Sequence, residues 1–369
     1  MRPGLPYEEN LPVERLAGIF ASTSASYKFF WFKAVFERAA AGESTLRYLD
    51  LVHDMITEAW YMVTEYHLSL GMSDQLQNLI GLLQERSALK PSEKKQKIRD
   101  YLETCTDPDV LRQKENLLNM VPYRLQSPFL PQPGRAKVYE GTPRAQIIRL
   151  NAYRNLMYYY SDFRRLDTTI TLEPDWLQYF RKNQEIIRGW LSYSLIQYLQ
   201  ARNPNVPGIS DKLEPPQARD LTHVKAYWKL LLSVHPVREI YTGQLLDGSA
   251  FSIDHFVPWS YVAHDELWNL NPTTRSINSS KSNDLPEWER YFPLLQQQEY
   301  ELYQEIWKHD KIHTAFERCA AKNLNDDRVR QRLYRAGQSE AEFCGQLEEV
   351  VSPVYRSAKN CGFREWRAG

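Results

Sequence analysis

The amino-acid sequence predicts a mainly α-helical protein that contains one short module of strands and a helix. Apolar side chains recur at helical spacing through residues 13–86, and residues 27–36 are apolar nearly all round, which favours a buried core helix. Residues 251–257 read instead as a strand, and residues 274–283 as a short polar helix. The fold class we expect is therefore helical domains with an embedded strand-and-helix module.

The composition excludes several classes of protein. The chain has 46 Lys and Arg against 46 Asp and Glu, so a nucleic-acid-binding surface must gather its positive charge locally. The four cysteines form no CxxC pair, which is typical of a reducing compartment. No apolar run reaches about eighteen residues, and the first residues lack the pattern of a signal peptide. We expect a cytoplasmic protein without a membrane partner. Without a Walker-type loop or GxGxxG, nothing supports the use of ATP or NAD.

Proline-rich breaks and shifts in composition suggest how the chain is organised. The stretch VPYRLQSPFLPQPGR marks a linker, and ARNPNVPGISDKLEPPQARD marks a second break. The expected segments are an N-terminal helical domain over 1–120, a Pro-rich linker over 121–143, a second helical region over 144–234, the strand-and-helix module over 235–290 and a C-terminal helical region with a basic tail over 291–369.

An acid and a histidine lie side by side in the module. On a strand, Asp254 and His255 point to opposite faces, so one can hold a metal ion while the other activates water. A hard divalent cation takes oxygen ligands, which Asp254 and the side-chain oxygen of Asn278 can supply. A neutral His255 can take a proton from water while the metal stabilises charge on a phosphate. The pattern favours a phosphodiesterase site. The alternative is a surface salt bridge or a satisfied hydrogen bond between the acid and the histidine, with the asparagines serving as turn residues.

The module is expected to fold as a hairpin followed by a helix. Residues 238–246 and 250–258 read as two strands, and Asp-Gly-Ser at residues 247–249 favours a turn between them. The polar helix over 274–283 follows. This order places the acid, the histidine and the later asparagine in one small unit.

The stretch FSIDHFVPWSYVAHDELWNLNPTTRSINSSKSNDLP resembles the ββα-metal core of HNH endonucleases, whose usual pattern is DHxxP, a loop and NLxxLCxxCNxxK. Asn269 with its following leucine, Asn278 and Lys281 match the pattern at the family's spacing. IDHFVPWS and KSNDLP are especially similar to the HNH domain of RNA-guided CRISPR effector nucleases, although the rest of that architecture is absent. The resemblance covers roughly residues 238–286.

The resemblance implies a role for each matched residue. Asp254 and Asn278 would be ligands of Mg²⁺ or Mn²⁺, and His255 would be the general base. Asn269 would brace the loop that carries the histidine, and Lys281 would contact the scissile phosphate. No structural zinc is expected, because the positions of the family's zinc-binding cysteines are occupied by other residues, namely Glu239, Thr242, Thr274 and Ile277.

The implied substrate is DNA, double-stranded by expectation, with RNA as an alternative. Basic residues alternate with aromatic ones in residues 144–199 and could contact phosphates and bases. The alternative, which we favour for residues 144–199, is an amphipathic helical domain with half-buried tyrosines. The candidate nucleic-acid-binding residues are Arg149, Arg154, Arg164, Arg165, Arg275 and Arg364.

The expected function is a metal-dependent HNH endonuclease that nicks DNA as a monomer. A single site cuts one strand at a time, so cutting both strands would need a homodimer or two events. The opening SYKFFWF resembles that of bacterial proteins which end in this type of core and are associated with antiviral defence. Two alternatives stay open: a nuclease subunit active only with partner proteins of a defence operon, and an HNH module that only binds nucleic acid.

Overall fold

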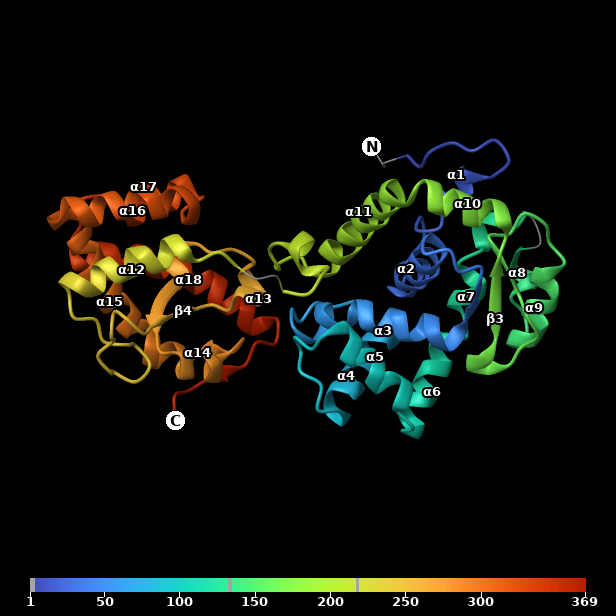
Figure 1. The fold of residues 1–369 in the computed structure, drawn as a ribbon, viewed down its shortest axis with the longest axis horizontal. Coiled ribbons are helices and arrows are strands. Elements are labelled where there is room, and N and C mark those ends of the chain that lie inside the picture. The colour runs from blue at the N-terminus through green and yellow to red at the C-terminus, as the bar shows by residue number, and fades with distance from the viewer. Residues whose placement is uncertain (1–3, 132–134, 217–218) are drawn as a thin grey trace. The chain divides into compact units, whose positions relative to one another are not determined.

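The computed structural model describes residues 4–131, 135–216 and 219–369 and divides the chain into two compact units. The first unit comprises residues 1–204 and 213–215, and the second comprises residues 205–212 and 216–369 (Figure 1). Each unit has a core of its own. Among the described residues, no helix is both long enough and apolar enough to cross a membrane.

The first unit consists of helices with one small antiparallel sheet, in the strand order β1-β3-β2. Its strands are β1 (Thr45–Arg47), β2 (Tyr158–Tyr160) and β3 (Thr169–Leu172). Its helices are α1 (Val13–Ala17), α2 (Tyr27–Ala40), α3 (Tyr48–Thr64), α4 (Gln75–Arg86), α5 (Lys95–Thr104), α6 (Pro108–Leu117), α7 (Val121–Arg124), α8 (Arg135–Val138), α9 (Pro143–Asn151), α10 (Pro174–Lys182) and α11 (Gln184–Arg202), with short 3₁₀ turns η1 (Ser127–Phe129) and η2 (Arg165–Asp167).

Helix α2 lies at the centre of this unit, which confirms the buried helix expected for residues 27–36. Phe30, Trp31 and Phe32 are almost completely buried. The indole nitrogen of Trp31 lies 3.1 Å from the Tyr158 hydroxyl on β2. Tyr158 and Tyr160 are buried on a strand, so the expectation of half-buried tyrosines on a helix is wrong there. Both hydroxyl groups donate to the Pro122 carbonyl, which gives the phenols a partner inside the core.

The Pro-rich stretch at residues 121–143 carries helical turns in the first unit. Its side chains at Tyr123 and Leu125 are completely buried, and residues 132–134 of the expected linker lie outside the described residues. The segment boundaries expected from the sequence stay a prediction.

The second unit consists of helices and two short pairs of strands. Its strands are β4 (Ser252–His255), β5 (Leu270–Thr273), β6 (Leu285–Pro286) and β7 (Glu365–Trp366). Its helices are α12 (Thr222–Val234), α13 (Trp259–Val262), α14 (Arg275–Lys281), α15 (Trp288–Lys308), α16 (Asp310–Asn323), α17 (Asp327–Leu333) and α18 (Glu340–Asn360), with short 3₁₀ turns η3 (Ile209–Lys212) and η4 (Leu267–Asn269). The mainly helical architecture with an embedded strand-and-helix module is therefore confirmed.

Strand β4 pairs with β5, and not with residues 238–246 as the sequence suggested. The two strands are antiparallel, with Asp254 opposite Asn271. Residues 238–246 form only an isolated bridge between Arg238 and Leu245. The chain folds back on itself between them at Gly243, whose φ of +74° favours glycine. This leaves β4 free to pair with β5.

Helix α14 follows β5 directly and contacts β4, which completes a ββα arrangement. The hydroxyl of Thr274 accepts a hydrogen bond from the backbone nitrogen of Ile277 (3.3 Å), so it caps the start of the helix. The helix ends before Ser282, whose φ of +50° is left-handed and cannot continue it. The last residue of the helix, Lys281, lies close to the end of β4.

Candidate active site

Asp254 lies at the end of β4 in a buried, polar setting. Its side chain is 3% exposed. The Tyr241 hydroxyl donates to Oδ2 at 2.6 Å, and the ammonium of Lys281 lies 3.1 Å from Oδ1. Burial, followed by the nearby Asp254 charge, raises the pKa of Tyr241 well above its ordinary value, so this phenol stays protonated and keeps donating. The carboxylate is therefore held from two sides.

Lys281 links the two elements that form the site. It projects from the last turn of α14, is completely buried, and donates both to Asp254 and to the backbone carbonyl of His255 (2.7 Å). Its ammonium faces the protein interior. Lys281 thus fixes the end of β4 against α14, and the phosphate contact implied by the family resemblance stays a prediction.

His255 has surroundings different from those of Asp254, as expected for neighbours on a strand. Its Nε2 lies 2.7 Å from Oδ1 of Asp265, and its side chain is 6% exposed. Burial lowers the pKa of His255, and the hydrogen bond to Asp265 opposes that shift only in part. A neutral imidazole bonded through Nε2–H to Asp265 keeps its other nitrogen as a proton acceptor. This is the state that a general base requires.

A cation also lies against this histidine. The Nη1 atom of Arg219 lies 3.2 Å from Nδ1 of His255 and 3.4 Å from Nε2. It is 3.8 Å from the Asp265 carboxylate. His255 is therefore in contact with one carboxylate, that of Asp265, and one guanidinium, that of Arg219.

Asn269 stabilises the chain just beyond the histidine. Its Oδ1 accepts from the backbone nitrogen of Val257 at 2.7 Å, and its Nδ2 donates to the carbonyl of the same residue at 2.8 Å. The backbone carbonyl of Asn269 also accepts from the nitrogen of Phe256 (2.8 Å). The side chain is buried. These contacts suit the bracing role implied for Asn269.

The side-chain oxygen atoms near Asp254 are suitable ligands for a hard divalent cation. Asn278 donates through Nδ2 to Ser252 and to the carbonyl of Ile253, so its Oδ1 is oriented away from those groups, and no described residue donates to it. Asn271 lies opposite Asp254, and its buried amide makes no hydrogen bond of normal geometry among the described residues. A carboxylate and amide oxygens are ligands that Mg²⁺ accepts, with water and phosphate filling the other positions. In the described part of the chain, no cluster of three or more His, Cys, Asp or Glu forms a metal site.

The expected nucleic-acid-binding arginines divide between the two units. Arg275 and Arg364 are exposed in the second unit, Arg275 in the first turn of α14. In the first unit, Arg149 donates to the carbonyls of Val138 and Glu140. The remaining members of the set are exposed: Arg154, Arg164 and Arg165. Their role in binding nucleic acid stays a prediction.

Sequence reasoning missed residues that the structure brings to the site. Tyr241 lies in the loop before β4, Asp265 follows His255 by 10 residues, and Arg219 precedes it by 36. Only the acid Asp265 could have been suspected from spacing, because a histidine base is often oriented by a nearby carboxylate. The positions of Tyr241 and Arg219 in the sequence do not indicate that the fold brings them to the site.

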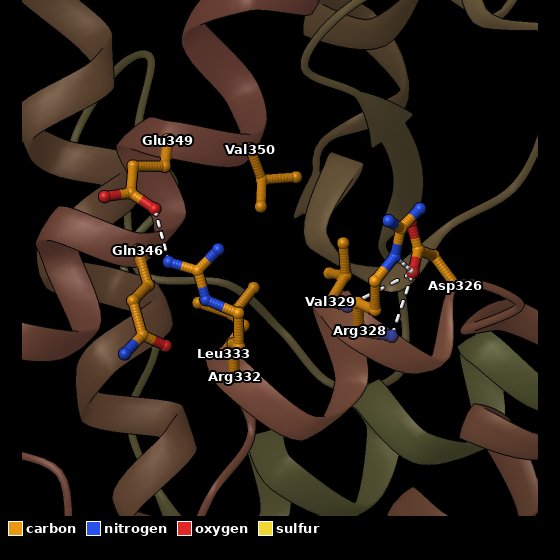
Figure 2. Close-up of a pocket in the computed structure, with 8 residues that line it drawn as sticks. All are labelled: Asp326, Arg328, Val329, Arg332, Leu333, Gln346, Glu349 and Val350. Atoms are coloured by element: carbon orange, nitrogen blue, oxygen red, sulfur yellow. Dashed lines mark hydrogen bonds and ion pairs between the residues drawn. The ribbon is translucent and has the colours of Figure 1, made fainter.

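A separate groove of about 260 Å³ lies between α17 and α18 in the second unit (Figure 2). Arg332 and Glu349 pair across it at 2.6 Å. Its lining contains none of the residues around His255 and Asp254. The groove is therefore not part of the candidate active site.

Two short antiparallel strands are followed by a helix, with Asp254 and His255 at the strand end and Asn278 on the helix, and together they form a ββα arrangement. The HNH endonuclease family matches residues 237–287, so this part of the chain is an HNH endonuclease domain. Comparison with curated proteins and with solved structures gives no match. The domain supports nuclease activity on nucleic acid.

Proposed function

We propose that the protein is a metal-dependent endonuclease that hydrolyses phosphodiester bonds of double-stranded DNA. The observation that carries the proposal is the position of His255, which is buried and bonded to Asp265, beside a separately held Asp254. A base and an oxygen ligand on opposite faces of one strand can act on the two sides of a single phosphate. This division of roles is what hydrolysis by an activated water needs.

The residues of this chain have distinct tasks in that reaction. His255 takes a proton from water at the ring nitrogen that Asp265 does not occupy, and Asp265 fixes the orientation of the ring. Asn269 holds the backbone after the histidine, and Lys281 holds Asp254 in place. Asp254 and Asn278 would hold a Mg²⁺ or Mn²⁺ ion. When bound, the ion stabilises charge on the phosphate and on the leaving oxygen.

The domain has one such site, so a monomer is expected to nick. Homodimerisation or a second event would give a double-strand break. We further propose a setting in prokaryotic defence against foreign DNA, with partner proteins from the same operon. The support for this setting is the resemblance of the SYKFFWF opening described above.

The first test is a supercoiled-plasmid assay with Mg²⁺, Mn²⁺ or EDTA. We expect the wild type to give open-circular DNA with either metal and none with EDTA, and His255→Ala to give none under any condition. Arg328→Ala is a matched control, because this side chain is 90% exposed on α17 and outside the site. Cleavage by His255→Ala at the wild-type rate would show that His255 is not the base.

The same assay separates the alternatives. Linear product appearing directly from purified monomer would contradict nicking. No cleavage by a folded wild type that still binds the plasmid would point to a binding module. Cleavage that appears only after partner proteins are added would indicate a subunit of an assembly. A parallel reaction with double-stranded RNA tests the other substrate.

A further inference from the structure

Arg219 lies against His255 and near two other side chains of the second unit. Its guanidinium contacts both ring nitrogens of His255, at 3.2 and 3.4 Å, and lies 3.8 Å from Asp265. Its central carbon also lies 5.3 Å from the ring centroid of Trp259. The contacts come from residues 36 or more positions later in the chain, so the position of Arg219 is a product of the fold and not of local sequence.

The donors and acceptors of the three side chains decide which nitrogen of the imidazole can accept a hydrogen bond from Arg219. A neutral imidazole offers one N–H and one lone pair. The carboxylate of Asp265 can only accept, so it takes the N–H at Nε2. The guanidinium of Arg219 can only donate, so of the two ring nitrogens only Nδ1 can accept from it; its Nη1 atom lies 3.2 Å from Nδ1 and 3.4 Å from Nε2, which places it against the ring and not in line with the lone pair. That lone pair is the one a general base must turn toward water.

Arg219 is also accessible, unlike the histidine it covers. Its side chain is 37% exposed, whereas that of His255 is 6% exposed. Its separation from Asp265 exceeds hydrogen-bonding distance, so the carboxylate does not lock it in place. A guanidinium binds a phosphate through two parallel hydrogen bonds, which is better than the single donor contact it makes to an imidazole nitrogen.

On the basis of the nuclease function proposed above, we propose that Arg219 is a substrate-binding residue that takes a backbone phosphate of the DNA. In the DNA-free protein, its guanidinium lies against the imidazole of His255 and limits access to the proton-accepting nitrogen. An incoming phosphodiester draws the guanidinium away and thereby frees the base. Arg219 thus makes availability of the base depend on the presence of the substrate.

The phosphate contact is tested by the salt dependence of DNA binding in EDTA, where cleavage is not required. A labelled 20-base-pair duplex is titrated with full-length wild type, Arg219→Ala, Arg219→Lys and Arg328→Ala at several NaCl concentrations. Loss of one phosphate contact should reduce the slope of log K against log salt by about 0.9 in Arg219→Ala. Arg219→Lys should keep a slope near that of the wild type, because a lysine also neutralises a phosphate. Arg328→Ala should match the wild type.

The covering of His255 is tested without DNA. Diethyl pyrocarbonate reacts with the free nitrogen of a neutral imidazole, and peptide mass spectrometry follows modification of His255. We expect the rate to rise several-fold in Arg219→Ala and to stay unchanged in Arg328→Ala. Circular dichroism of each variant confirms that the fold is kept.

Each outcome bears on the proposal. An unchanged salt slope in Arg219→Ala overturns the phosphate contact, and an unchanged modification rate of His255 overturns the covering. If the wild type binds and cuts DNA while Arg219→Ala behaves identically, only the role of Arg219 fails. If the wild type neither binds nor cuts DNA, the proposed function fails with it.

Discussion

Replacing Lys281 by methionine should destabilise the second unit strongly. Lys281 and Asp254 are both buried, with side chains 1% and 3% exposed, and their charged atoms lie 3.1 Å apart. Lys281→Met keeps most of the volume but leaves a buried carboxylate without its cation. Breaking a buried pair in this way costs about 3–5 kcal/mol of the free energy of unfolding, against about 0–1 kcal/mol for an exposed pair. With a urea slope of about 2 kcal/mol/M, the unfolding midpoint falls by about 2 M.

The assay is urea unfolding in EDTA, followed by tryptophan fluorescence, with the variants Lys281→Met, Asp254→Asn and both together. Each single variant leaves one charge unpaired, whereas the double variant leaves none and keeps the Tyr241 hydroxyl bonded to an amide. The double variant should therefore be more stable than either single variant. A loss below about 1 kcal/mol in Lys281→Met would refute this account of the buried pair.

Two buried titratable groups predict opposite effects of pH on the two units. Burial, followed by the charge of Lys114, lowers the pKa of His53 in the first unit from 6.5 to about 3. Between these two pH values, His53 is protonated in the unfolded chain but neutral in the folded unit. The first unit should lose about 1.4 kcal/mol per pH unit as the pH falls below 6.5, and thermal melting of His53→Gln should show a smaller loss. In the second unit, burial raises the pKa of Glu299 to about 8 from 4.5, so stability should fall as the pH rises through that interval. Glu299→Gln should melt at a higher temperature than the wild type at pH 8 and at a similar one at pH 4.5; equal melting at pH 8 would contradict the assignment.

Local pattern was enough to place the strand and helix that carry the candidate site. The apolar residues on either side of Asp254 and His255 predicted a strand over residues 251–257, which contains β4, and the polar run after Thr274 predicted α14 within two residues of its bounds. Both elements depend on near neighbours in the chain. Thr274, for example, caps the helix that begins at the next residue.

The partner of β4 was not predictable by the same means. Strand β5 contains Pro272, a residue that normally argues against a strand. It is tolerated because the sheet has only two strands, so each strand has a free edge that needs no ladder hydrogen bond. The contacts of Tyr241, Asp265 and Arg219 are likewise set by tertiary folding. Spacing along the sequence carries no information about them.

Strand β7 pairs in parallel with β6, so Glu365 and Trp366 lie beside Leu285 and Pro286, a few residues after the end of α14. The backbone nitrogen of Leu285 donates to the carbonyl of Arg364, and Tyr355 donates to the carbonyl of Pro286. During synthesis, the ribosome releases the whole HNH domain long before it reaches residues 364–366. The pairing of β6 with β7 therefore cannot form until those late residues emerge. A chain interrupted before them would lack this pairing.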